Sequence, residues 1–291
     1  MKSITQIFKG FDWFFLASGI MTYTLGSVIA SQAGQPWKLD RYVYGLVIFL
    51  GLYLLERIYY YLSTSKISLF STVNRTEKLK SPELIGLLFL VFAGLVYSLF
   101  VLNQSKVLGQ SGWLWLFVLV LLFSMNISRS IRLWNMPYRW LVDGLIVSPI
   151  SLFFASSVQG LAPGRILFFL SIPLLLFYLT SSTCLQFERY SSELSKGTRS
   201  FLVTLGWEKG VVIHNIILLL AFIFFGVYLY VSGAWSIAWP VFLMLIISLA
   251  EVYLLQRLAE GMKPNWRLLR AVAVFQYLGV VYILLFAFLT H

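Results

Sequence analysis

The sequence predicts an all-α integral membrane protein, a polytopic bundle of about nine transmembrane helices. Three observations support this fold class: 59% of the 291 residues are hydrophobic, only 11% are charged, and the apolar residues gather in runs of roughly bilayer-spanning length. An ordinary soluble protein has roughly a quarter of its residues charged. The apolar content also excludes a disordered chain, and alternating segments of about ten residues, typical of a β-barrel, are absent.

The apolar runs fall into nine stretches, and a spanning helix needs about 20 apolar residues. The fourth stretch is the weakest, because it is short and ends in Asn126. We expect helices at about Phe11–Ala30, Tyr42–Leu62, Glu83–Leu102, Gly112–Ile127, Trp140–Val158, Ile166–Phe187, Gly210–Val231, Ile237–Leu255 and Leu268–Leu289.

Lys and Arg residues are divided unequally between the two ends of these helices. The N-terminal segment and the loops after even-numbered helices carry 17 of them, whereas the loops after odd-numbered helices carry four: Lys38, Arg41, Lys106 and Arg165. Positively charged loops stay in the cytoplasm, so we expect a cytoplasmic N-terminus and an external C-terminus. The same topology accounts for the net charge of +11, and no nucleic-acid partner is expected.

A short pattern occurs twice, at Glu56-Arg57 and Glu188-Arg189, each time followed after four further residues by Leu-Ser. The offset of 132 residues and the matching place at the ends of the second and sixth helices indicate a parallel duplication. We expect one transmembrane domain, 1–291, with repeat units at about 1–132 and 133–260 and an extra helix at 261–291.

The segment Gln186–Gly206, QFERYSSELSKGTRSFLVTLG, follows the sixth expected helix. Its informative residues are Gly197, Arg199, Ser200, Leu205 and Gly206. A second segment, Asn135–Arg139, follows the fourth helix and contains a Pro-x-Arg stretch. Together with nine helices, these segments resemble the UbiA superfamily of intramembrane prenyltransferases. The resemblance implies a central cavity that opens to the cytoplasm and to the lipid.

Members of that superfamily bind a prenyl diphosphate through Mg²⁺ held by two Asp-rich motifs. Alignment on Gly197 places Arg189 and Glu193 at the two aspartate positions of the second motif. The first motif would lie within Tyr53–Lys66, where every register offers only one carboxylate, Glu56. All three aspartates of the chain lie outside both motifs: Asp12, Asp40 and Asp143. We therefore expect no metal site and no cofactor, with Mg²⁺ needed only if the chain is an enzyme.

Basic side chains near the cytoplasmic mouth suggest a different use of the same cavity. Arginine grips phosphate with two parallel hydrogen bonds and needs no metal. The expected phosphate- or lipid-binding residues are Arg57, Lys66, Arg132, Arg139, Arg189, Lys196 and Arg199. The interpretation that follows is a divergent UbiA-like protein that binds an isoprenoid-type lipid, pigment or quinone without Mg²⁺-dependent prenyl transfer. Other subunits of a larger membrane complex are candidate partners.

Three alternatives stay open at this stage. In a structural lock, Glu56-Arg57 and Glu188-Arg189 form crossed salt bridges between the second and sixth helices, and Arg189 pairs with Glu193 along one helix. In an active prenyltransferase that uses a prenyl diphosphate and a lipophilic or carotenoid acceptor, the catalytic candidates Glu56, Glu188 and Glu193 converge on a metal. A small-molecule transporter would instead need inverted repeats and broken helices.

Single polar residues inside the expected helices have simpler interpretations. Asp143 is placed to pair with Arg139 at i,i+4, and Glu251 to pair inside the bundle or face the headgroups. His214 is expected to be a hydrogen-bonded core residue. The sequence shows no Cys/His metal spacing, no Gly-rich nucleotide loop and no Ser/His/Asp set.

Overall fold

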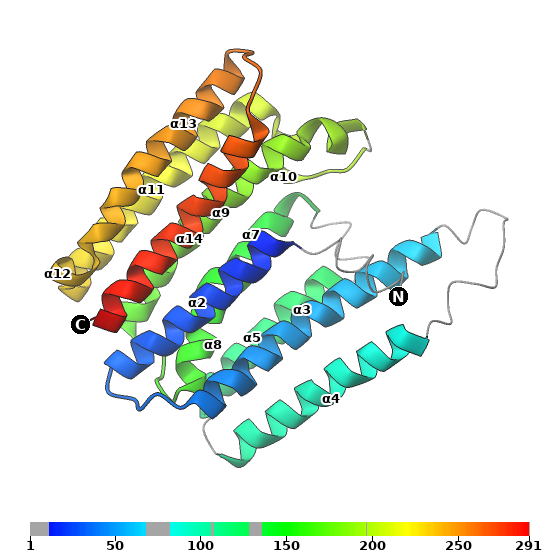
Figure 1. Ribbon diagram of the computed structural model, residues 1–291, viewed down its shortest axis with the longest axis vertical. Helices are drawn as coiled ribbons and strands as arrows, with labels where there is room; N and C mark the ends of the chain where they lie inside the picture. Colours follow the sequence, from blue (N-terminus) through cyan, green and yellow to red (C-terminus); the bar gives the residue numbers. More distant parts are fainter. Residues whose placement is uncertain (1–11, 68–81, 106–107, 128–135, 196, 291) are drawn as a thin grey trace.

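The computed structural model describes residues 12–67, 82–105, 108–127, 136–195 and 197–290, and within these ranges it is helical throughout, with no strand. Helices are joined by short turns (Figure 1). The elements are α2 (Trp13–Gln32), α3 (Leu39–Ile67), α4 (Pro82–Gln104), α5 (Gln110–Ile127), η2 (Met136–Tyr138), α7 (Arg139–Leu145), η3 (Ile146–Ile150), α8 (Ser151–Val158), α9 (Arg165–Ser195), α10 (Phe201–Leu205), α11 (Trp207–Ser232), α12 (Trp235–Ala238), η4 (Trp239–Met244), α13 (Leu245–Ala259) and α14 (Trp266–Thr290).

The expectation of nine spanning helices is confirmed, because the described residues contain nine helices long and apolar enough to cross a membrane. The weak fourth stretch forms α5. The fifth span, Arg139–Val158, runs through α7, η3 and α8, and the π turn η3 contains Pro149, which has no backbone N–H to donate. The eighth span, Trp235–Ala259, runs through α12, η4 and α13.

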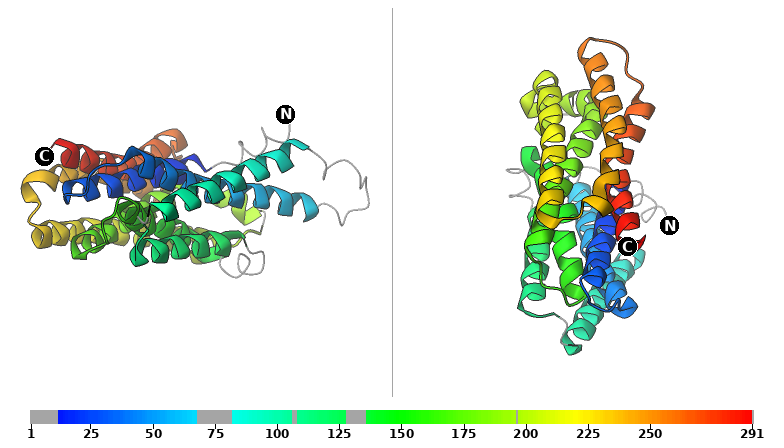
Figure 2. Two further views of the ribbon diagram at one scale, coloured as in Figure 1. Left: turned by 90° about the horizontal axis from the view of Figure 1, so that it is seen from below. Right: turned by 90° about the vertical axis from the view of Figure 1, so that its left-hand side faces the viewer.

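The helices lie in two layers (Figure 2). One layer holds α13, α14, α2 and α3, and the other holds α11, α9, α8 and α5. The layers meet where α2 packs against α8 and where α14 packs against α9. Large apolar side chains fill the core of the bundle, among them Tyr23, Phe154, Phe177, Phe225 and Tyr277, all essentially inaccessible to solvent.

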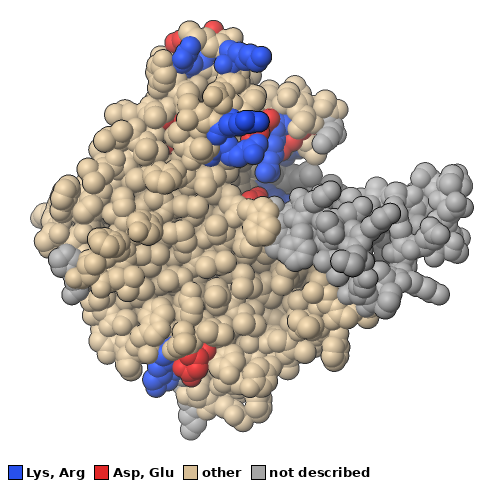
Figure 3. Space-filling view, viewed as in Figure 1, with Lys and Arg blue, Asp and Glu red and all other residues tan. Residues whose placement is uncertain are grey.

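The outer surface is apolar across its middle. In the view of Figure 3, Lys and Arg gather where α13 ends and α14 begins, a smaller charged spot lies at the opposite end, and uncharged residues cover the surface between. Helix α4 exposes large apolar side chains such as Phe89, 71% exposed, and Leu90, 68% exposed. Trp37, Trp113, Trp235 and Trp239 are exposed near the ends of their spans, as in an interfacial aromatic belt. These features fit a multi-pass integral membrane protein.

The segments that carry the predicted site residues lie at one end of the bundle. Helices α2, α7 and α14 begin there, and α3 and α9 end there (Figure 1). We call this the basic end, because the lysine- and arginine-rich loops join the helices at this end. Helix α14 ends at the opposite end of the bundle from the start of α2, as an odd number of spans requires (Figure 1).

Candidate functional site

A cavity of about 450 Å³ lies at the basic end, between the start of α2, the end of α3, the start of α7, the end of α9 and α10. We call it the arginine cavity, because four arginines line it. Its lining residues are Asp12, Arg57, Arg139, Trp140, Asp143, Ser182, Gln186, Arg189, Glu193, Thr198, Arg199, Ser200 and Phe201.

A second cavity of about 550 Å³ adjoins the first between α2, α9 and α14. The two cavities share Asp12, Asp143, Ser182 and Arg189. Glu188, Ser192 and Arg270 also line the second cavity, and its remaining lining residues are nonpolar. We call this cavity the annex. Its nonpolar lining residues are Trp13, Phe14, Tyr178, Leu185 and Val274.

Helix α9 supplies the longest wall of the arginine cavity. Ser182, Gln186, Arg189 and Glu193 follow one another at spacings of four, three and four residues, which places them on one face of an α-helix. The helix is 31 residues long, more than the roughly 20 residues that a bilayer core requires. Its last turns therefore carry Arg189 and Glu193 to the basic end.

The segment that resembles the UbiA motif tail folds back over this wall. Helix α9 ends at Ser195, and shortly after it Gly197 has a φ of 65°, in the left-handed region that favours glycine. The backbone N–H of Thr198 donates to the carbonyl of Glu193 at 3.0 Å. Ser200 then caps α10, accepting from the N–H of Val203 at 3.4 Å, and this turn brings Arg199 to the cavity.

Arg139 binds two carboxylates on the side of the cavity opposite α9. Its Nη2 lies 3.1 Å from Glu56 Oε1, and its Nε lies 3.6 Å from Asp143 Oδ2. Asn126 Nδ2 donates to Asp143 Oδ1 at 3.1 Å. Glu56 is 6% exposed at its side chain, so this is a largely buried charge network. The expected i,i+4 pairing of Arg139 with Asp143 is confirmed.

Asp12 is a cavity residue that sequence reasoning missed. It caps the N-terminus of α2, where its Oδ1 accepts from the backbone N–H of Phe15 at 3.1 Å. Its own backbone N–H donates to Tyr53 Oη at 3.0 Å, which ties α2 to α3. The guanidinium of Arg57 lies over the Tyr53 ring, 5.0 Å from its centroid. An aspartate directly before an apolar run is a helix N-cap signal, and this could have placed Asp12 at the end of the bundle.

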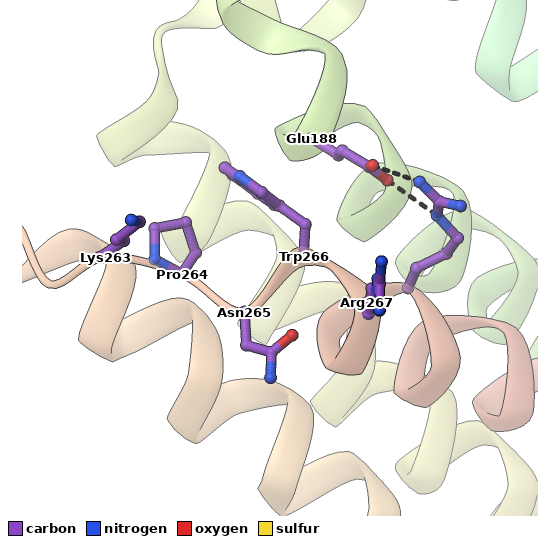
Figure 4. Close-up of a pocket in the computed structure, with 7 residues that line it drawn as sticks. Glu188, Lys263, Pro264, Asn265, Trp266 and Arg267 are labelled. Atoms are coloured by element: carbon purple, nitrogen blue, oxygen red, sulfur yellow. Dashed lines mark hydrogen bonds and ion pairs between the residues drawn. The ribbon is translucent and has the colours of Figure 1, made fainter.

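The prediction of crossed salt bridges between Glu56-Arg57 and Glu188-Arg189 is wrong. Glu56 pairs with Arg139, whereas Glu188 pairs with Arg270 of α14, whose Nε lies 3.0 Å from Glu188 Oε2 (Figure 4). Helix α3 packs against α4, α5 and α8, while α9 packs against α11 and α14. Arg57 and Arg189 line the same cavity, but the two glutamates pair with arginines of different helices, α7 and α14. The expected pairing of Arg189 with Glu193 is also wrong among the described residues.

The structure brings together four of the seven predicted phosphate-binding residues, Arg57, Arg139, Arg189 and Arg199. The side chains of the other three lie outside the described residues: Lys66, Arg132 and Lys196. Within the described part of the chain, no carboxylate forms an ion pair with Arg189 or Arg199. These two guanidinium groups are available to an anionic ligand.

The three predicted catalytic glutamates take separate places. Glu56 binds Arg139, Glu188 lines the annex beside Arg270, and Glu193 lines the arginine cavity with its Oε2 buried. Among the described His, Cys, Asp and Glu residues, a group of three or more with metal-ligand spacing occurs at Cys184, His214 and Glu251, and it includes none of these glutamates.

The arginine cavity has two unlike walls. Arg189 and Arg199 give the α9–α10 wall a positive surface beside Glu193, whereas the wall formed by α2 and α7 carries Asp12 and Asp143. An anion therefore fits best against the α9–α10 wall. No protein-family model matches this chain, and no curated protein is significantly similar to it in sequence.

Proposed function

We propose that the protein binds an isoprenoid lipid with an anionic phosphate or diphosphate headgroup, and does so without a metal ion. The observation that carries this proposal is the placement of Arg57, Arg139, Arg189 and Arg199 on one cavity at the basic end. The UbiA-like segments supply Arg189 and Arg199, so the resemblance and the geometry point to the same ligand class.

The headgroup would lie against the α9–α10 wall. Arg189 and Arg199 each present a planar fork of N–H donors that matches phosphate oxygens. Arg139 is less available, since Glu56 and Asp143 hold its guanidinium. The acidic wall would repel a second anion, which favours a single headgroup at one side of the cavity.

The isoprenoid chain would lie in the annex, against its nonpolar lining residues Trp13, Phe14, Tyr178, Leu185 and Val274. The annex shares Ser182 and Arg189 with the arginine cavity, so head and tail positions are adjacent. The rings of Phe14 and Tyr178 stack there with centroids 5.3 Å apart. Flat aromatic faces of this kind pack well against the unsaturated carbons of a prenyl chain.

Binding of matched probes to the detergent-purified protein tests this assignment. Geranylgeranyl diphosphate carries head and tail, geranylgeraniol carries the tail alone, and inorganic diphosphate carries the head alone. We expect the first to raise the unfolding temperature most, because only it fills both cavities. Equal effects of geranylgeranyl diphosphate and geranylgeraniol would show that the arginines do not recognise the headgroup.

A second candidate function is Mg²⁺-dependent prenyl transfer. The observation in its favour is that Asp12, Asp143 and Glu193 line the arginine cavity, where carboxylates suit Mg²⁺. Release of diphosphate from a labelled prenyl diphosphate, measured with Mg²⁺ and with a chelator, distinguishes the two. Metal-dependent release would replace the binding proposal with an enzyme.

A further inference from the structure

A second polar cluster lies apart from the arginine cavity, inside the half of the bundle formed by α9, α11 and α13. It consists of Cys184, His214 and Glu251, each with 0% of its surface exposed. His214 lies seven residues from the start of α11, so the cluster is about 10 Å inside the basic end. A carboxylate at this depth in a membrane helix is rare and needs compensation.

The ligand atoms of the three side chains converge. One sulfur, nitrogen or oxygen atom from each lies within 4.8 Å of the other two. His214 Nε2 is 3.2 Å from Glu251 Oε1. A tetrahedral Zn²⁺ ion with bonds of about 2.0–2.3 Å separates its ligand atoms by roughly 3.3–3.7 Å, so small side-chain movements would complete such a site.

The hydrogen-bond partner of His214 is compatible with a cation in this position. Its Nδ1 lies 3.0 Å from Asn215 Oδ1. In the tautomer in which Nδ1 donates to this amide oxygen, His214 presents a lone pair at Nε2. Two acceptors, Nε2 and Glu251 Oε1, then face each other at 3.2 Å, and the Cys184 thiol is a side-chain hydrogen-bond partner of the same carboxylate. A positive charge between them removes this conflict.

We propose that Cys184, His214 and Glu251 bind a zinc-class transition-metal ion. The donor set of thiolate, imidazole and carboxylate is the one that Zn²⁺ uses in proteins. On binding, the Cys184 thiol releases its proton to solvent, and the thiolate and the carboxylate together balance the two charges of the ion. The loaded site is therefore electrically neutral, which lowers the cost of burying it among apolar helices.

The three side chains supply three ligands of a tetrahedral ion, and a water molecule would take the fourth position. Asn215 fixes the imidazole from outside, as the second-shell partners of metal-binding histidines do. An apolar shell closes the site, with buried side chains that include Phe187, Leu202, Val211, Leu255 and Leu269. A closed site ties three helices together, and α9, one of the three, also forms the cationic wall of the arginine cavity.

The repeat gives an internal comparison. At an offset of 132 residues, Leu52 corresponds to Cys184, Pro82 to His214 and Leu119 to Glu251. Leu119 is 0% exposed, so an apolar side chain serves the same packing position in the first half of the chain. Helix packing alone therefore does not require polar residues at the positions of the cluster.

The direct test is the metal content of the full-length protein, expressed with added zinc and purified through a tag without histidines. We expect about one zinc ion per chain after washing with a weak chelator. Replacement by Co²⁺ should give the ligand-field bands of a tetrahedral ion and a thiolate charge-transfer band. Protein without bound zinc, or Co²⁺-loaded protein without the thiolate band, would overturn the proposal and leave a proton shared within the cluster.

Substitutions of the proposed ligands test whether the ion binds at this cluster. We expect Cys184→Ser and Glu251→Gln to lower zinc content roughly ten-fold or more, and Asn215→Ala to weaken zinc affinity about 10–100-fold. Ser248→Ala is the matched control, because Ser248 lies on the same helix and donates to Gln276 Oε1 rather than to the cluster. Equal zinc content in the control and the ligand variants would contradict the assignment, and the wild-type measurement decides the question if a ligand variant fails to fold.

Discussion

Two glutamate–arginine pairs occupy comparable places in the two halves of the chain but differ in their surroundings. Glu56 of α3 binds Arg139, and Glu188 of α9 binds Arg270, with sequence separations of 83 and 82 residues. In each pair, a glutamate near the end of one span binds an arginine near the start of the third span after it. The first pair is mostly buried, whereas the side chains of Glu188 and Arg270 are 28% and 59% exposed.

The comparison indicates that the burial of an ion pair determines how much the pair contributes to the stability of the fold. Arg139 also binds Asp143, so its loss would strand two carboxylates in a poorly solvated network. Arg270 faces water at the mouth of the bundle, where solvent screens the charge left behind. The first pair therefore stabilises the wall of the arginine cavity, and the second contributes little to the stability of the fold.

The largest effect is expected at Arg139. Arg139→Gln should lower the free energy of unfolding by about 3–5 kcal/mol, because it leaves the buried Glu56 without its counter-charge. Denaturant unfolding in detergent measures the change, with Arg270→Gln as the matched control. Equal stability of the two variants would remove the proposed difference between the pairs.

The next effect concerns ligand binding rather than stability. Arg189→Gln should weaken binding of geranylgeranyl diphosphate by about 1.5–3 kcal/mol, the range for a hydrogen bond to a charged group, which is roughly 10–150-fold. Its stability should stay close to wild type, since Arg189 forms no ion pair with a described residue. Titration calorimetry measures the affinity. Arg257→Gln is the control, because Arg257 lies on α13 outside both cavities; an equal loss in that variant would indicate a general charge effect.

A smaller effect is expected at Tyr53, which ties the start of α2 to the first pair. Tyr53→Phe removes the hydroxyl that accepts from the backbone N–H of Asp12, and should lower stability by about 0.5–1.5 kcal/mol. At an offset of 132 residues the second half has Leu185, which has no such hydroxyl. Thermal unfolding would detect the change, and an unchanged midpoint would mean that water replaces the hydroxyl there.

The smallest effect is expected at the exposed pair. Glu188→Gln should change the free energy of unfolding by no more than about 1 kcal/mol, and the difference should shrink as salt concentration rises. Unfolding curves at low and high ionic strength measure both. A larger, salt-independent loss would show that the pair is shielded from water, for example by a partner subunit.

Much of the fold could be predicted from the sequence, because a spanning helix is specified locally by a run of apolar residues. All nine expected spans formed helices, and the local pair Arg139–Asp143 also formed as expected. Partners distant in sequence could not be predicted. Glu56 and Arg139 are separated by 83 residues, and apolar helices carry little information about which faces meet.

The same limit applies to the two sites. Four arginines of the cavity were expected from their shared place at the cytoplasmic mouth, whereas Asp12 was missed because only its capping position marks it. The cluster of Cys184, His214 and Glu251 draws one residue from each of three helices. Because no two of its members are close in sequence, metal-ligand spacing could not reveal it.

The central claim is that the arginine cavity recognises an anionic isoprenoid headgroup without a metal. Its most direct test is the affinity of the purified wild-type protein for geranylgeranyl diphosphate, measured with excess chelator and again with Mg²⁺. We predict the same affinity in both conditions, since Arg189 and Arg199 supply the positive charge. Binding that requires Mg²⁺, or no binding in either condition, would contradict the account.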